Sequence, residues 1–347
     1  MFVKKVLKNL MEYVKFGPSR IKVSRICLGT WQLPRSKEKD MYGVYKVDVE
    51  EFKRVFKVAV DNGINFIDTA NIYHGAMTAV DTRHAGNAEK ILGEILKDYE
   101  REMFVIVTKV RQRVAPGPNE EGLSRKHIMW QIKESLRRLD MDHVDVYLTH
   151  NPDPDTPKLE TLRTLNDLVT RGLVHYIGSS NEPAEEIVES MELTKRYNLH
   201  TYITIQEPYS LLARRIEEKE IPIAKKYGLA LMAYSPLAGG LLTPKYLKGI
   251  PELSRASYSK GWKRVLTKEN LQVISELNEV AKELDITLPQ LAIAWIIHKG
   301  EKFGVTTVPI IGVSKLQHLE DNLRALEVKL KDDDIKRVEE ISSRFKW

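Results

Sequence analysis

Eight short apolar runs alternate with helix-like segments along the whole chain. Each run reads as a buried strand, and apolar residues recur at helical spacing in the segment that follows it. Parallel neighbours in one sheet need such crossover connections. Strict alternation with eight members favours an α/β fold of the closed (β/α)8 type, a TIM barrel, over the alternative of an open doubly wound sheet. The runs are RICLGT, INFID, FVIVTK, VDVYLTH, LVHYIGS, TYITIQ, LALMAYS and TTVPIIG.

Three segments lie outside this repeat. Residues 12–24 contain two short strands around a Gly-Pro turn, which predicts a hairpin that plugs the bottom of the barrel. Residues 236–266 predict a long loop after the seventh strand, and residues 331–344 an extra C-terminal helix. No linker rich in Pro, Gly or Ser divides the chain, so residues 1–347 are expected to form a single barrel domain.

Composition excludes several classes of protein. The net charge of +6 is mild, and basic residues are interleaved with acidic ones, so a nucleic-acid partner is not expected. No stretch approaches 18 uncharged apolar residues, and the N-terminus lacks the features of a signal peptide. The single cysteine, Cys27, cannot form a disulfide within the chain, which suits a reducing compartment. A cytoplasmic protein without membrane partners is predicted, with no signal for a particular oligomeric state.

Four polar side chains stand at or just after the ends of three consecutive runs. They are Asp68, Tyr73, Lys109 and His150. Because parallel strands end at one rim of a barrel, these side chains are expected to converge there. Lys109 would lower the pKa of Tyr73 and make it a general acid, and His150 would donate to a carbonyl oxygen. The alternative is a purely structural buried pair of Asp68 and Lys109.

Known phosphate and metal motifs are absent. The sequence has no G-x-G-x-x-G, no P-loop, no cysteine pair and no H-E-x-x-H, so no metal is expected. His74, Asp81 and His84 share one loop, where solvated side chains are the simpler interpretation. A phosphate site is predicted after strands seven and eight, from Ser235, Gly239 and Gly240 and from Gly312, Ser314 and Lys315. Ordinary turns and an N-cap are the alternative for each segment alone.

From about Met11 to Asn322 the chain resembles the aldo-keto reductase family. KVSRICLGTW, FIDTANIY, VTK and LTHNPD match the family's first strand and its catalytic motifs. The resemblance implies that Tyr73 is the acid, that Asp68 and Lys109 tune it, and that His150 orients the substrate, with Trp31 also at the substrate. Residues 74–88 form a longer loop than most relatives have at this place, and residues 1–10 are an N-terminal extension.

The resemblance also implies a site for NADP(H), with NAD(H) as a further option. Lys315 would favour NADPH, whereas His318 stands where relatives often have Arg or Gln. Tyr234 would stack on the nicotinamide, whose carboxamide Ser180, Asn181 and Gln206 would hold. The complete expected cofactor set is Thr30, Trp31, Asp68, Ser180, Asn181, Gln206, Tyr234, Ser235, Leu237, Gly239, Gly312, Ser314, Lys315, His318, Asp321 and Asn322.

Two functions are therefore expected as alternatives. The first is an NADPH-dependent reductase that converts small aldehydes or ketones to alcohols. Candidate pocket walls are Trp31, Tyr42, loop 111–123 and loop 236–262 with Trp262, and ordinary packing is the alternative for each. The second is a non-catalytic, NADPH-binding redox sensor that resembles the β subunits of potassium channels.

Overall fold

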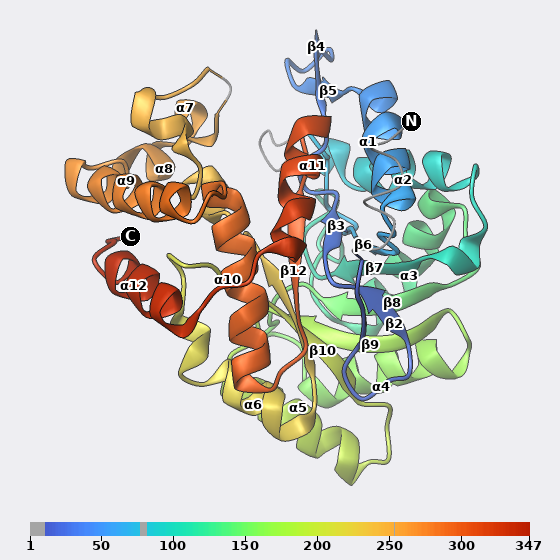
Figure 1. Ribbon diagram of the computed structural model, residues 1–347. Helices are drawn as coiled ribbons and strands as arrows, with labels where there is room; N and C mark the ends of the chain where they lie inside the picture. Colours follow the sequence, from blue (N-terminus) through green and yellow to red (C-terminus); the bar gives the residue numbers. More distant parts are fainter. Residues whose placement is uncertain (1–10, 77–81, 253) are drawn as a thin grey trace.

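The computed structural model describes residues 11–76, 82–252 and 254–347, and its centre is a closed barrel of eight parallel strands (Figure 1). Each predicted apolar run forms one of them, so the predicted fold is confirmed. Around the barrel the strands are β3 (Cys27–Gly29), β6 (Phe66–Asp68), β7 (Val105–Val110), β8 (Val144–Thr149), β9 (Val174–Ser180), β10 (Tyr202–Pro208), β11 (Ala230–Tyr234) and β12 (Thr307–Gly312).

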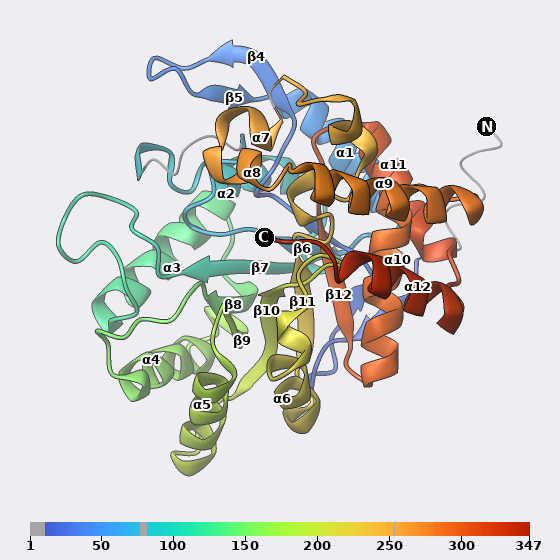
Figure 2. The ribbon, with the colours of Figure 1, turned by 90° about the vertical axis from the view of Figure 1, so that its left-hand side faces the viewer.

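Helices surround the barrel and cover its outer face (Figures 1 and 2). Their starts follow local sequence signals: Asp48 accepts a hydrogen bond from the Glu51 amide, and Ser124 accepts one from the His127 amide. The longer helices are α1 (Val49–Asp61), α2 (Asn87–Leu96), α3 (Arg125–Leu139), α4 (Lys158–Thr170), α5 (Ala184–Arg196), α6 (Glu220–Tyr227), α9 (Lys268–Glu283), α10 (Leu288–Phe303), α11 (Leu316–Leu323) and α12 (Asp332–Ser342). The last of these is the predicted C-terminal helix.

Alternate residues of the strands face two separate apolar cores. Leu28, Ile67 and Ile106 pack outward against the helices, whereas Phe66 and Val107 fill the barrel interior. Since both faces of each strand are buried, the strands are apolar throughout, as expected for a parallel sheet.

The predicted N-terminal hairpin is present and closes the barrel from below. Strands β1 (Tyr13–Lys15) and β2 (Lys22–Ser24) pair antiparallel. Between them Phe16 is fully buried in the inner core, with its ring centroid 5.0 Å from that of Phe66. Gly17 has a φ of +59°, and a Cβ there would lie 2.0 Å from the Ile203 carbonyl oxygen. The close approach of the hairpin to the barrel therefore requires glycine.

Two segments at the other end of the barrel differ from expectation. A second antiparallel hairpin, β4 (Arg35–Lys39) and β5 (Tyr45–Val47), projects above the barrel in Figures 1 and 2 and was not predicted. The segment 236–266 is not a plain loop. Its described residues form four short helices, η6 (Ala238–Gly240), η7 (Pro244–Lys248), α7 (Arg255–Tyr258) and α8 (Lys260–Arg264).

Two predictions fall on residues outside those described, namely the extension 1–10 and the part of the long loop that contains Asp81. Among the helices of the described ranges, none combines the length and apolar character needed to cross a membrane.

Candidate active site

The four predicted catalytic side chains meet at the carboxyl ends of three neighbouring strands. Asp68 is the last residue of β6, Lys109 lies near the end of β7, and His150 directly follows β8. Tyr73 lies in the loop after β6, where its amide donates to the Ala70 carbonyl oxygen. β6 pairs with β7 and β7 with β8, so these groups reach one rim, as expected for a TIM barrel.

Lys109 is the centre of this group. Its side chain has no exposed surface, and its ammonium lies 2.8 Å from Asp68 Oδ1, 2.8 Å from the Thr69 carbonyl oxygen and 3.0 Å from the Tyr73 hydroxyl. The other carboxylate oxygen of Asp68 accepts a hydrogen bond of 2.8 Å from Gln206 Nε2. Three acceptors thus use the three N–H bonds of the ammonium, and the Tyr73 hydroxyl is held at a fixed place.

Two aromatic rings lie beside Tyr73. The ring of His150 packs edge to face at a centroid distance of 5.6 Å, and the ring of Trp31 does so at 5.0 Å. Nδ1 of His150 is buried and has no hydrogen-bond partner among the described residues. A buried polar atom of this kind is costly unless a ligand or water satisfies it. The predicted substrate residues Trp31, Tyr73 and His150 are therefore together in one place.

Burial governs the protonation of these groups. It raises the pKa of Tyr73 above its ordinary value, and the nearby Lys109 charge, which acts in the opposite direction, does not overcome it. The expected lowering of this pKa is therefore wrong, because desolvation of the phenolate outweighs its attraction to the ammonium. Burial and the charges of Lys109 and Arg111 hold the pKa of His150 well below its usual value. Burial also disfavours charged Lys109, but Asp68 and Tyr73 raise its pKa overall. At neutral pH the site holds a phenol, a neutral imidazole and an ammonium.

A cavity of about 1100 Å³ extends from Tyr73 and His150 to helix α11. Eighteen of the residues predicted by name line it. They are Trp31, Asp68, Tyr73, His150, Ser180, Asn181, Gln206, Tyr234, Ser235, Leu237, Gly239, Gly240, Gly312, Ser314, Lys315, His318, Asp321 and Asn322.

Several predicted residues do not line the cavity. Thr30 is fully buried and its amide donates to the Asp68 carbonyl oxygen, so it supports the site from behind. Tyr42 is half exposed and contacts His84. Of loop 111–123 only Gln112 reaches the cavity. Trp262 instead packs on Gly239, where an added Cβ would lie 2.6 Å from its ring.

The middle of the cavity has the polar groups expected for a carboxamide. Asn181, with a φ of +57°, donates to the His150 carbonyl oxygen and accepts from the Tyr234 hydroxyl at 2.8 Å. Ser180 donates to the carbonyl oxygen of Gln206. These contacts fix an amide, a hydroxyl and an aromatic ring along one wall, at the ends of β9, β10 and β11.

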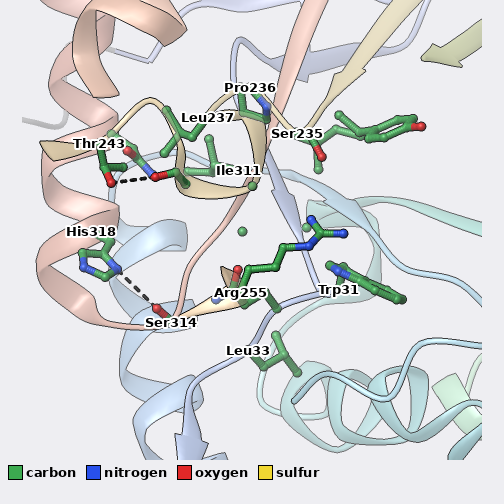
Figure 3. A pocket seen from close by; sticks show the side chains of 18 of the residues that line it. Trp31, Leu33, Ser235, Pro236, Leu237, Thr243, Arg255, Ile311, Ser314 and His318 are labelled. Carbon is green, nitrogen blue, oxygen red and sulfur yellow. Dashed lines mark hydrogen bonds between the residues drawn. The ribbon is translucent and has the colours of Figure 1, made fainter. Parts of the chain in front are cut away.

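The far end of the cavity suits a phosphate. Ser235 and Gly239 have φ values of +56° and +62°, and they place a tight backbone turn at the wall. Burial lowers the pKa of His318, and so do the charges of Lys315 and Lys245. In Figure 3, Ser314 and His318 lie at this end and are joined by a hydrogen bond. Clustered cationic groups beside a backbone turn favour an anionic ligand.

Sequence reasoning missed several residues of the cavity wall. Leu33 lines it and was not predicted. Thr243 and the basic residues Lys245, Lys248 and Arg255 also line it; they belong to loop 236–262, which was a predicted pocket wall, but none of them was predicted by name. Figure 3 shows the Arg255 side chain extending into the cavity between Ser314 and Trp31. A signal for these three basic residues is present in the sequence, because they follow the predicted phosphate-binding residues Gly239 and Gly240 in the same loop.

The histidines of the long loop are engaged in packing. The rings of His74 and His84 are 4.7 Å apart, His74 Nδ1 accepts from the Ala76 amide, and His84 Nε2 lies 2.6 Å from Asp40 Oδ2. This last contact ties the long loop to the turn between β4 and β5.

Comparison with known proteins agrees with this geometry. The sequence profile of the Aldo/keto reductase family matches residues 25–343, and the chain belongs to this family. The chain is 36% identical to a probable voltage-gated potassium channel subunit beta of Arabidopsis thaliana, over 325 residues that cover 92% of each protein. The same identity and coverage hold for a protein of that description from Oryza sativa subsp. japonica. A putative voltage-gated potassium channel subunit beta of Schizosaccharomyces pombe is 35% identical, over 94% of this chain and 91% of its own.

Proposed function

We propose that the protein is an NADPH-dependent reductase of aldehydes or ketones. One observation carries this proposal: a fully buried ammonium, Lys109, holds the hydroxyl of Tyr73 at 3.0 Å on the floor of a large cavity. A buried charged pair contributes little to stability because desolvation offsets the attraction. An arrangement that also orients a phenol toward a cavity is better explained by catalysis.

Each residue then has a definite task. A reduced nicotinamide, when bound, supplies the hydride. Tyr73, which burial keeps protonated, donates its proton to the carbonyl oxygen. Neutral His150 donates a hydrogen bond to the same oxygen as negative charge develops on it. Lys109, held by Asp68, stabilises the phenolate that Tyr73 becomes.

The cavity wall supports a dinucleotide phosphate as the second ligand. Ser180, Asn181, Gln206 and Tyr234 would hold the nicotinamide. Lys315 and Lys245 lie close enough to lower the pKa of His318 through their charges. This cationic cluster would bind the additional phosphate that distinguishes NADPH from NADH.

The test compares Tyr73→Phe with the unaltered protein. Turnover of carbonyl compounds, followed as NADPH oxidation, is expected to fall by roughly 10²–10⁴ because the general acid is lost. Binding of NADPH, followed by its fluorescence, is expected to persist, and to be tighter than binding of NADH. Tyr45→Phe, on the projecting hairpin, is the matched control and keeps full turnover. Equal turnover in Tyr73→Phe and the unaltered protein would refute the assigned role.

The relatives favour a second candidate, a nucleotide-binding subunit of a larger assembly, because those reported above are described as channel β subunits. The two candidates differ in one measurement. A subunit of this kind binds NADPH tightly and turns over none of a panel of aldehydes and ketones, whereas the reductase oxidises NADPH with at least one of them.

A further inference from the structure

We propose that His143, Asp145 and His175 form a binding site for a divalent transition-metal ion, with Zn²⁺ as the probe. The site lies at the amino ends of β8 and β9, the opposite end of the barrel from the cavity. It is therefore separate from the proposed reductase site and does not depend on it.

The sheet register brings the three side chains together. Asp145 is the second residue of β8, and His175 is the second residue of β9. The two strands pair Val144 with Val174 and Val146 with Tyr176, so Asp145 and His175 are side by side between these pairs. His143 immediately precedes β8, and its ring lies 4.2 Å from that of His175, centroid to centroid.

His143 has the surroundings of a metal-binding histidine. Nδ1 of His143 lies 2.7 Å from Asp142 Oδ1, a contact in which Nδ1–H donates to the carboxylate. Nε2 is buried and has no hydrogen-bond partner within the described part of the chain. A carboxylate on the far nitrogen is the usual support of a metal-binding histidine.

The carboxylate of Asp145 is held from one side only. Its Oδ2 accepts hydrogen bonds from Arg101 at 2.7 Å and from the Ile106 amide at 2.8 Å. Its Oδ1 lies 3.7 Å from His175 Nδ1, which is longer than a hydrogen bond. Arg101 therefore fixes the position of the carboxylate and leaves Oδ1 beside His175.

Only a small movement separates this arrangement from coordination. One ligand atom from each of the three residues lies within 4.8 Å of the others. Around Zn²⁺, with bonds of about 2.0–2.2 Å in a tetrahedron, ligand atoms are roughly 3.3 Å apart. The rings of His143 and His175 are now stacked, with 28° between their planes. The ring of His175 must therefore rotate to point a nitrogen at the same ion as His143. Its side chain is 45% exposed, which permits the rotation.

The ligand set selects the class of metal. Two imidazoles and one carboxylate, with water in the fourth position, suit Zn²⁺, Cu²⁺ or Ni²⁺. Mg²⁺ and Ca²⁺ prefer oxygen ligands and are not expected to bind. Since the ligands come from the starts of two neighbouring strands, a bound ion would link them and stabilise the folded chain.

The experiment is calorimetric titration of Zn²⁺ into the full-length, EDTA-treated protein. We expect binding that His175→Gln weakens by at least about tenfold. Zn²⁺ should also raise the Tm of the unaltered protein and leave that of His175→Gln unchanged. His84→Gln, in the pair of histidines whose rings meet edge to face, and His200→Gln, at an exposed site, are controls that retain binding.

The outcomes are distinct. Absence of Zn²⁺ binding to the unaltered protein overturns the proposal. So does binding that survives His175→Gln, or that is lost in His84→Gln. His143→Gln, examined by circular dichroism for correct folding, is the second variant, and retained affinity in it would equally exclude the site.

Discussion

Removal of the buried ammonium by Lys109→Met tests the electrostatics of the proposed site. The substitution preserves most of the side-chain volume and removes the charge. Asp68 then retains the hydrogen bond from Gln206 but loses its cation, and the Thr69 carbonyl oxygen loses its donor. Breaking a buried ion pair by removal of one partner costs about 3–5 kcal/mol, because a charge remains buried without compensation.

The loss is large enough to measure. Unfolding entropies near 2.1 cal/mol/K per residue, applied to all 347 residues, convert this cost to a fall of about 4–7 °C in Tm. Calorimetry and urea unfolding give the value. Lys57→Met, which removes an exposed ion pair with Asp61, is the matched control and leaves Tm within error.

A second substitution distinguishes charge from packing. The double variant Asp68→Asn/Lys109→Met removes both charges and keeps an acceptor for Gln206, so most of the lost stability is expected to return. If Tm falls equally in the single and double variants, packing and not an uncompensated carboxylate accounts for the lost stability. The electrostatic argument would then be wrong.

Two further predictions concern the protonation of the site and the loop beside it. Turnover is expected to be flat from about pH 6 to 9, because the lowered pKa of His150 keeps it neutral and the raised pKa of Tyr73 keeps it protonated. The raised pKa also means that the contribution of Tyr73 to stability, present below pH 10, is lost as the pH rises further. A rate inflection near pH 6.5 that disappears in His150→Gln would contradict this. Gly239→Ala should lower the free energy of unfolding by about 1–2 kcal/mol, because alanine is strained at this positive φ. It should also expose segment 241–265 to proteolysis, because the new Cβ meets the ring of Trp262. Gly172→Ala has a similar φ and open space, so it should show the stability cost without the cleavage.

The barrel and the catalytic groups could be predicted because their signals are local. An apolar run that ends in Asp68, Lys109 or His150 indicates both a buried strand and the rim at which it ends. The projecting hairpin β4–β5 gave no such signal. Its first strand, RSKEK, has no fully buried residue, so no alternation of apolar and polar side chains marks it.

The direction of the pKa shift of Tyr73 could not be predicted from the positions of residues in the sequence. The expected convergence of Lys109 and Tyr73 at one rim of the barrel suggested that the ammonium would lower the pKa of the phenol. The sign depends on how much water the folded chain removes around Tyr73, which is a property of tertiary packing. The same limit applies to Arg255, whose side chain extends into the cavity from α7, a helix within the segment 236–266 that the sequence predicted as a loop.

The complete burial of Lys109 has a practical consequence for chemical labelling. Acylating reagents modify amines that solvent can reach. The surface carries many lysine amines of this kind, whereas the amine of Lys109 is fully buried. A preparation acetylated across its exterior should therefore keep an unmodified amine at this position as long as it stays folded, and loss of that protection would report the opening of the barrel itself.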